Sequence, residues 1–279
     1  MTDRIDAHHH LWRYRPADFP WIGENMGVLK CDFLPADLAP ELAGAGIHGT
    51  VVVQACQTLD ETEWLLSVAK DSKFIKGVVG WAPIAGPTFP ECLERLRTHA
   101  SLKGLRHIIQ DEPDPRFMQR EDFNRGVSAL ADTGLVYDLL VFEKQLPSAL
   151  EFVDRHPRQI FVLDHIGKPR IKDALMEPWR GHIFEMARRK NVYCKLSGVV
   201  TEAHWSNWSF DELRPYLDAV FEAFGPSRLM AGSDWPVCLL ATGYGAWFET
   251  LNKFTGALSE SERELIFGSV AADVYHLRP

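Results

Sequence analysis

Short apolar runs of four to seven residues recur along the chain, separated by stretches with apolar positions three and four residues apart. The runs are rich in β-branched residues and most lack polar alternation, which is typical of strands buried on both faces. They predict eight strands, at residues 5–9, 50–54, 75–81, 104–109, 135–140, 160–163, 192–196 and 229–232. Helical spacing predicts helices at residues 60–69, 89–99, 123–132, 146–155 and 177–190.

This alternation of strands and helices favours a parallel sheet with helices packed outside it. Eight strands are also the number that closes a (β/α)8 TIM barrel within roughly 250 residues. The alternative is an open doubly wound sheet, which would more often carry a glycine-rich phosphate turn after its first strand; this chain carries histidines there. We therefore predict an α/β fold, a TIM barrel formed by a single domain over residues 1–279.

The connection after the first predicted strand is unusually long. Residues 11–37 show neither helical nor strand periodicity and are rich in aromatic side chains. Loops of this length inside a compact domain are usually lids or binding loops. We therefore expect this segment to lie at the mouth of the barrel.

Composition narrows the class of protein. Of the 279 residues, 46% are hydrophobic and 24% charged, which excludes collagen-like and disordered chains. Lys and Arg number 30 against 38 Asp and Glu, and the net charge of −8 argues against a nucleic-acid partner. Five scattered cysteines without a C-x-x-C pair suit a reducing compartment. Because neither a signal peptide nor a span of ~18 apolar residues is evident, we expect a cytoplasmic protein without a membrane partner.

Histidines gather at the end of the first predicted strand, where the active sites of TIM barrels lie. This strand runs into His8, His9 and His10. Because side chains alternate along a strand, His8 and His10 point the same way and His9 points the other. Two imidazoles on one side suit metal coordination or polarisation of a substrate. The alternative is a surface cluster of histidines.

Two further candidates follow other predicted strands. His165 comes directly after the sixth strand, where it could polarise a carbonyl or orient a water, or be a core histidine bonded to the backbone. Asp234 comes after the eighth strand, where its carboxylate could bind a metal or act as a general base. An aspartate before Pro236 also suits a turn or a helix cap.

Charged and polar residues also occur within the predicted strands. Arg106 and Gln110 share one face of the fourth strand, and Arg106 needs either a carboxylate or a substrate oxygen as its partner. Asp138 lies inside an apolar run and must be paired if it is buried. Lys195 on the seventh strand is either an electrostatic group of the site or the buried partner of an acid.

Taken together, His8-x-His10, His165 in an Asp-His-x-Gly setting and Asp234 in a Gly-Ser-Asp-Trp-Pro setting resemble the amidohydrolase superfamily over essentially the whole chain. The stretches IDAHHHLW, GLRHIIQDE, DHIGKP and GSDWPVC are similar to its branch of sugar lactonases, which act on L-fuconolactone or L-rhamnonolactone. The resemblance implies a hydrolase of carbohydrate metabolism that opens a sugar lactone to the aldonic acid.

The resemblance also implies roles for single residues. Asp234 is expected to accept a proton from the attacking water, and His8, His10 and His165 to stabilise the oxyanion. One divalent ion such as zinc is implied on His8, His10 and Asp234, while catalysis without a metal stays open. A binuclear site is not expected, because the fifth strand carries Asp138 where metal-dependent members carry a histidine.

Four residues are candidates for contact with the sugar. Arg106 and Gln110 are expected to bind its hydroxyl groups, and Trp21 and Trp235 to offer flat apolar surfaces at the mouth of the barrel. The alternative function is a metal-dependent decarboxylase or hydratase of the same superfamily, acting on an aromatic or unsaturated acid. A third function to be considered is that of a non-catalytic small-molecule binder. The sequence determines neither the sugar nor the oligomeric state.

Overall fold

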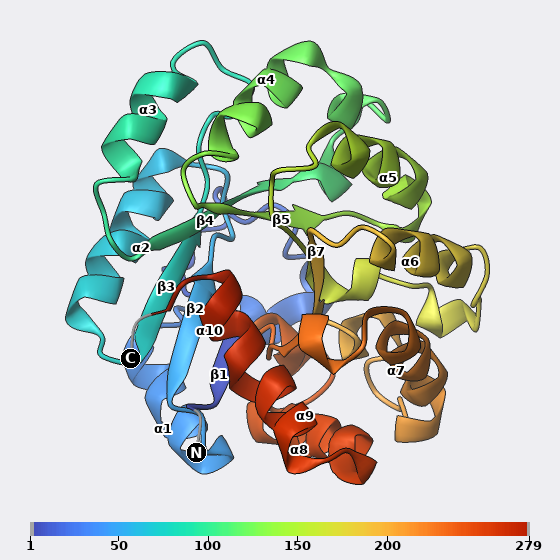
Figure 1. Ribbon diagram of the computed structural model, residues 1–279. Coiled ribbons are helices and arrows are strands. Elements are labelled where there is room, and N and C mark those ends of the chain that lie inside the picture. The colour runs from blue at the N-terminus through green and yellow to red at the C-terminus, as the bar shows by residue number, and fades with distance from the viewer. Residues whose placement is uncertain (1–2, 278–279) are drawn as a thin grey trace.

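Eight parallel strands form the centre of the molecule in the order β1 to β8 (Figure 1). The computed structural model describes residues 3–277, so the first and last two residues of the predicted domain lie outside it. A bridge between His9 and Trp235 brings the segment after the last strand back against the first, and the sheet closes into a TIM barrel. The strands are β1 Ile5–His9, β2 Gly49–Val53, β3 Ile75–Gly80, β4 Leu102–Ile108, β5 Val136–Leu140, β6 Phe161–Leu163, β7 Val192–Leu196 and β8 Leu229–Ala231.

One α-helix follows each strand and packs outside the barrel (Figure 1). The fold prediction is confirmed, and each predicted strand matches an observed one to within two residues. The helices near 40 and 215, which contain Pro40 and Pro215, and those after residue 243 were not predicted. The helices are α1 Pro35–Ala45, α2 Leu59–Asp71, α3 Phe89–Leu96, α4 Glu121–Leu130, α5 Leu146–Arg155, α6 Trp179–Ala187, α7 Phe210–Phe224 and α8 Tyr244–Phe254, followed by α9 Glu260–Glu264 and α10 Val270–Val274.

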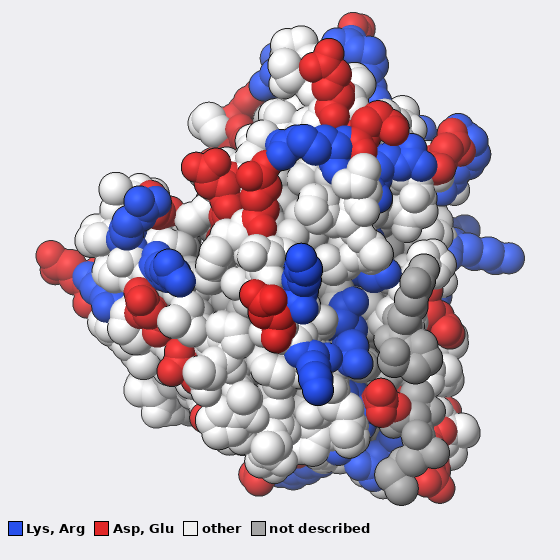
Figure 2. All heavy atoms as spheres, turned by 90° about the vertical axis from the view of Figure 1, so that its left-hand side faces the viewer, with Lys and Arg blue, Asp and Glu red and all other residues white. Residues whose placement is uncertain are grey.

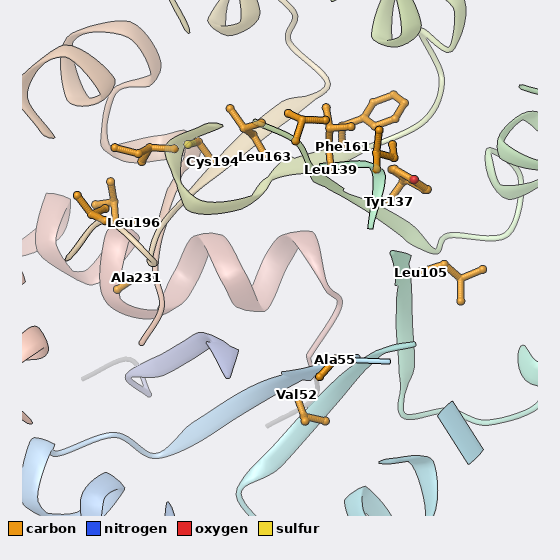
Figure 3. Packing of buried hydrophobic residues seen from close by; sticks show 14 of the residues in the cluster. Val52, Ala55, Leu105, Tyr137, Leu139, Phe161, Leu163, Cys194, Leu196 and Ala231 are labelled. Atoms are coloured by element: carbon orange, nitrogen blue, oxygen red, sulfur yellow. The ribbon is translucent and has the colours of Figure 1, made fainter. Parts of the chain in front are cut away.

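Apolar residues of the strands divide between two layers. Those that point outward pack against the helices, as Figure 3 shows for Leu139, Leu163 and Leu196 on three successive strands. Those that point inward, such as Val162 and Met230, form a smaller cluster together with residues of α10. α10 packs against this inner cluster, and the polar residues of the site lie where the strands finish.

The surface carries mixed charge. On the face shown in Figure 2, basic and acidic side chains are interspersed, so that no broad region has a single sign. Within residues 3–277, none of the helices is long and apolar enough to cross a membrane.

The long connection after β1 folds on an aromatic core of its own. Trp12 and Phe33 pair through two backbone hydrogen bonds of 3.0 and 2.9 Å, which hold the two ends of the loop together. The Trp12 ring contacts Phe19, Trp21 and Phe33, with ring centroids 5.2–6.1 Å apart. The segment contains a short 3-10 helix, Glu24–Leu29, and ends where α1 begins at Pro35, slightly earlier than residue 37.

Candidate active site

Three predicted site residues meet where the barrel closes. His8 and His10 come from the end of β1, and Asp234 follows β8. The Nε2 atoms of the two histidines are 3.2 Å apart, and Asp234 Oδ1 lies 3.3 Å from Nε2 of His10 and 3.7 Å from Nε2 of His8. His9 points elsewhere, to Thr50 Oγ1 at 2.9 Å, as the alternation of the strand predicts.

His165 joins this group from the end of β6. Its Nε2 atom is 3.9 Å from Asp234 Oδ1, and its ring centroid is 4.5 Å from that of His8. Its other nitrogen, Nδ1, is 2.9 Å from Ser197 Oγ. One carboxylate oxygen of Asp234 therefore lies within 4 Å of a ring nitrogen from each of three histidines.

Backbone contacts across the closure of the barrel hold these residues. The Asp234 N–H donates to the carbonyl of His8 at 2.8 Å, and the His10 N–H donates to the carbonyl of Trp235 at 2.6 Å. Asp234 itself has a left-handed backbone, with φ of 58°. A non-glycine residue in this region has a cost of roughly 1–2 kcal/mol, and such strain concentrates at functional sites.

The turn after β6 is left-handed over four consecutive residues. The φ angles from His165 to Lys168 are 53°, 50°, 71° and 48°. The imidazole of His165 packs directly over Gly198, where an added Cβ would lie 2.5 Å from the ring nitrogen Nδ1. The glycine therefore leaves the space that His165 needs in order to reach Asp234.

The hydrogen-bond partners of His8 and His10 leave a lone pair on each of them directed at Asp234. His10 Nδ1 is 2.8 Å from the carbonyl of Val53, so this nitrogen carries the proton and Nε2 does not. His8 Nδ1 lies 3.3 Å from Asp164 Oδ1 and 3.2 Å from the ammonium of Lys195. When Nδ1 donates its proton to Asp164, Nε2 of His8 is free as well. Second partners of this kind fix the orientation of metal-binding histidines.

The spacing of these three side chains fits one tetrahedral ion. Ligand atoms about 2.0–2.2 Å from a zinc ion lie roughly 3.3–3.6 Å from one another. The three observed spacings are 3.2, 3.3 and 3.7 Å. Two imidazole nitrogens and one carboxylate oxygen are also a donor set that zinc accepts, with room for further ligands. The predicted trio therefore suits a single divalent metal.

A second trio, His8, Asp164 and His165, is also compact enough to hold an ion. The ammonium of Lys195 lies against two of its members, 3.0 Å from Asp164 Oδ1 and 3.2 Å from His8 Nδ1. This fixed positive charge beside two of the three side chains disfavours a second cation there.

The charges inside the barrel are paired with one another. Lys195 forms an ion pair with Asp138, which also accepts a 2.7 Å hydrogen bond from the hydroxyl of Tyr275. Arg106 donates to Asp164 Oδ2 at 2.9 Å. Of the two roles considered for Lys195, the structure therefore supports the buried partner of an acid. For Arg106, the structure shows a carboxylate partner, which is Asp164.

Burial keeps two histidines of the site, His8 and His165, neutral at physiological pH. It lowers the pKa of His8 well below the ordinary value and that of His165 to about 4. Burial alone would raise the pKa of Asp234, but its electrostatic interactions with His165, His10 and the cation Lys168 outweigh burial and hold that pKa below the ordinary value. Neutral imidazoles beside a carboxylate are the protonation states needed to bind a metal or to accept a proton from water.

A cavity of about 310 Å³ opens above this group. Its lining includes His10, His165 and Asp234, and also Arg106, Gln110 and Trp21 from the predicted substrate contacts. Gln110 lies in a short 3-10 helix, Ile109–Asp111, because β4 ends one residue earlier than predicted.

Trp235 does not line this cavity. Its side chain is buried and meets the edge of the Phe33 ring, with centroids 5.1 Å apart. It anchors the long loop to the barrel next to Asp234, and so it is placed away from a sugar in the cavity.

Comparison with known proteins agrees with this architecture. A family model described as "Amidohydrolase" matches residues 5–277. The chain belongs to this family. Among its relatives, proteins named L-fucono-1,5-lactonase from Burkholderia multivorans and Burkholderia ambifaria are 44% and 36% identical, and these matches cover 98% and 99% of this chain and 96% and 97% of theirs.

A solved structure of an amidohydrolase from Burkholderia multivorans, described with bound zinc, is also similar. It superposes with a TM-score of 0.96 at 43% identity, over 99% of this chain and all of that one. Barrel and site are thus arranged on a framework shared with this member of the amidohydrolase family.

The sequence reasoning missed several residues of this amidohydrolase site. Lys168, Glu202 and Trp205 line the cavity, and Asp164 lies behind His8. Lys168 and Asp164 flank His165 within the DHIGKP stretch, so their positions in that motif could have identified them. Glu202 and Trp205 lie in the connection after β7, where no local pattern marks them.

Proposed function

We propose that this protein is an enzyme that hydrolyses a sugar lactone, L-fucono-1,5-lactone or a close relative, to the open aldonic acid. The observation that carries the proposal is the position of Asp234 at the floor of the cavity, with three imidazole nitrogens within 4 Å of one oxygen. The two relatives named L-fucono-1,5-lactonase support the same reaction. The cavity of about 310 Å³ is at the small end of ligand pockets, as suits one sugar ring.

One divalent ion such as zinc fits His8 Nε2, His10 Nε2 and Asp234 Oδ1, and when bound it supplies a Lewis acid that polarises the carbonyl and lowers the pKa of water. Asp234 uses its other oxygen, Oδ2, to accept the proton of the attacking water. Within residues 3–277 the contacts of the Asp234 carboxylate are all made by Oδ1, so Oδ2 is available to the cavity that Asp234 lines.

His165 stabilises the oxyanion that forms on the ring carbonyl. When the Ser197 hydroxyl donates to Nδ1, the proton of the neutral imidazole is on Nε2, the nitrogen that faces Asp234. A preorganised donor of this kind is commonly worth ~3 kcal/mol of transition-state stabilisation. Asp234 then returns its proton to the leaving ring oxygen, which completes the opening of the ring.

The charge balance of the cavity wall favours a neutral substrate. Arg106 is bound to Asp164, and Lys168 lies 3.4 Å from Glu202. Each of these cations is already balanced by a carboxylate, so the wall offers no unmatched charge as the partner for the carboxylate of an acid substrate. A lactone needs no such partner, whereas a decarboxylase of aromatic or unsaturated acids does.

A pH-indicator assay of acid release from several aldonolactones tests this proposal. The wild-type protein should open L-fucono-1,5-lactone, chelation should remove the activity, and added zinc should restore it. Asp234→Asn should reduce kcat by at least 100-fold without loss of the folded state, because it removes the proton acceptor. Asp132→Asn, at an exposed position, is the matched control. Absence of acid release from every lactone, or near-normal turnover of Asp234→Asn, would contradict the proposal.

A further inference from the structure

Three polar side chains form a second group on the wall of the same cavity. Gln110 follows β4, Lys168 follows β6 and Glu202 follows β7, so three separate loops contribute. Lys168 Nζ is 3.0 Å from Gln110 Oε1 and 3.4 Å from Glu202 Oε1. None of the three takes part in the mechanism described above.

This group is held rigidly. Lys168 is the last residue of the left-handed turn that begins at His165, so its position is tied to that of the oxyanion donor. Its ammonium also lies 5.1 Å from the centroid of the Phe142 ring, a favourable contact for a cation. The side chains of Lys168 and Glu202 are only 17% and 20% exposed. Little conformational freedom remains to be lost when a ligand binds.

The group keeps free hydrogen-bonding capacity toward the cavity. Lys168 has three N–H donors, of which one is donated to Gln110 Oε1 and another can point to Glu202 Oε1 in the ion pair, so that at least one remains. Among the described residues, the Nε2 amide of Gln110 and the Oε2 oxygen of Glu202 have no hydrogen-bond partner. Donors and an acceptor thus stand side by side, and this combination matches neighbouring hydroxyl groups, each of which both donates and accepts.

We infer that Lys168, Glu202 and Gln110 form a specificity subsite that binds adjacent hydroxyl groups of the lactone ring, an inference that rests on the function proposed above. Lys168 donates to one hydroxyl and Glu202 accepts from its neighbour. Trp205 and Trp21, which line the same cavity, cover the apolar face of the ring. Because Lys168 and His165 belong to one turn, binding the hydroxyls also places the carbonyl against Nε2 of His165.

The subsite makes a prediction about selectivity between two lactones of equal ring size. L-fucono-1,5-lactone carries ring hydroxyls, whereas δ-valerolactone carries none. A hydrogen bond to a charged group contributes about 1.5–3 kcal/mol, which corresponds to roughly 10–100-fold in kcat/KM. Lys168→Met and Glu202→Gln should each lower kcat/KM for the hydroxylated lactone by this factor. For δ-valerolactone the change should stay within about 3-fold.

Steady-state kinetics on both lactones, with the zinc-loaded protein, test the inference. Lys172→Met is the matched control, since Lys172 is exposed, lies in the same loop and does not line the cavity. Thermal melts establish that each variant is folded, and Glu202→Gln serves as the second probe if Lys168→Met fails to fold.

The possible outcomes separate the two proposals. A loss confined to the hydroxylated lactone supports the subsite. Equal losses on both lactones would mean that the residues act at the reacting carbonyl or on the fold. No loss on either lactone would mean that the residues do not bind substrate. Both results overturn the inference and leave the proposed lactonase function unaffected. If the wild-type protein opens neither lactone, the proposed function itself fails, and the subsite with it.

Discussion

Lys195 provides a direct test of how the interior of the barrel supports the site. Its side chain is completely buried, and its ammonium contacts Asp138 and lies 3.0 Å from Asp164 Oδ1 and 3.2 Å from His8 Nδ1. Together with Arg106 it balances the two carboxylates, so that the four charges behind His8 sum to zero. Lys195→Met removes one positive charge and keeps a long side chain in place.

Two buried carboxylates would then share a single cation. Removal of one partner from a buried ion pair has a cost of about 3–5 kcal/mol, because the remaining charge is left unpaired. In a chain of this size each kcal/mol shifts the melting temperature by about 2–4 °C, so Tm should fall by about 6–20 °C. The His8 ring should also lose its fixed position, which weakens zinc binding.

A second substitution restores the balance of charge. Asp138→Asn alone leaves an unmatched cation, but combined with Lys195→Met it removes one charge of each sign and keeps an acceptor for the hydroxyl of Tyr275. Replacing both partners of a buried pair is usually far less harmful than removing one. The double variant should therefore be at least about 2 kcal/mol more stable than the sum of the two single effects predicts.

Urea unfolding followed by tryptophan fluorescence measures these differences, in the presence of a chelator so that bound metal does not contribute. The slope with urea should be the same for all four proteins, and only the midpoint should move. If Lys195→Met is within 1 kcal/mol of the wild type, or if the two substitutions are simply additive, the charge balance described here does not stabilise the barrel.

Three further outcomes are expected. Gly198→Ala should lower kcat at least about 10-fold, since the added Cβ would lie 2.5 Å from His165 Nδ1. Gly46 is also left-handed but has open space around an added Cβ, so Gly46→Ala should lose about 1–2 kcal/mol of stability and keep its activity. Equal activities of the two variants would refute the steric explanation. Burial raises the pKa of Glu61 from 4.5 to about 8, so the folded state binds this proton more tightly than the unfolded chain. The resulting stabilisation is complete below pH 4.5 and is lost as the pH rises through 8. The free energy of unfolding should therefore fall over this window in the wild type and less in Glu61→Gln, and parallel profiles would contradict the prediction. Zinc at 100 times its Kd should stabilise the wild-type protein by about 2.7 kcal/mol, as measured by calorimetry. Equal stabilisation of His10→Ala by zinc would show that His10 is not a ligand of the metal.

Much of the fold and the centre of the site could be predicted from the sequence. Parallel strands are buried on both faces, so their apolar runs identify them without help from the rest of the chain. Parallel strands also finish at one end of a barrel, and so residues as distant in sequence as His8, His165 and Asp234 could be expected to meet. The alternation of side chains was enough to separate His10 from His9.

Other features depend on contacts that no local pattern encodes. Trp235 follows Asp234 directly, but its ring packs against Phe33, which the long loop places beside it. Nothing in the sequence identifies the acid that partners Lys195, whose ammonium contacts both Asp138 and Asp164. Glu202 reaches the cavity only because its connection runs beside the turn that carries Lys168.

The closure of the barrel between β1 and the segment after β8 has a consequence for biosynthesis. Asp6 and His8 lie near the start of the chain and contact Ser233 and Asp234 near its end. Asp234 comes 226 residues after His8. At translation rates of about 5–20 residues per second, Asp234 is synthesised on the order of 10–45 s after His8. The trio His8, His10 and Asp234 is therefore incomplete at every earlier stage. Under the function proposed above, metal loading and activity would begin only when the last strand closes the barrel.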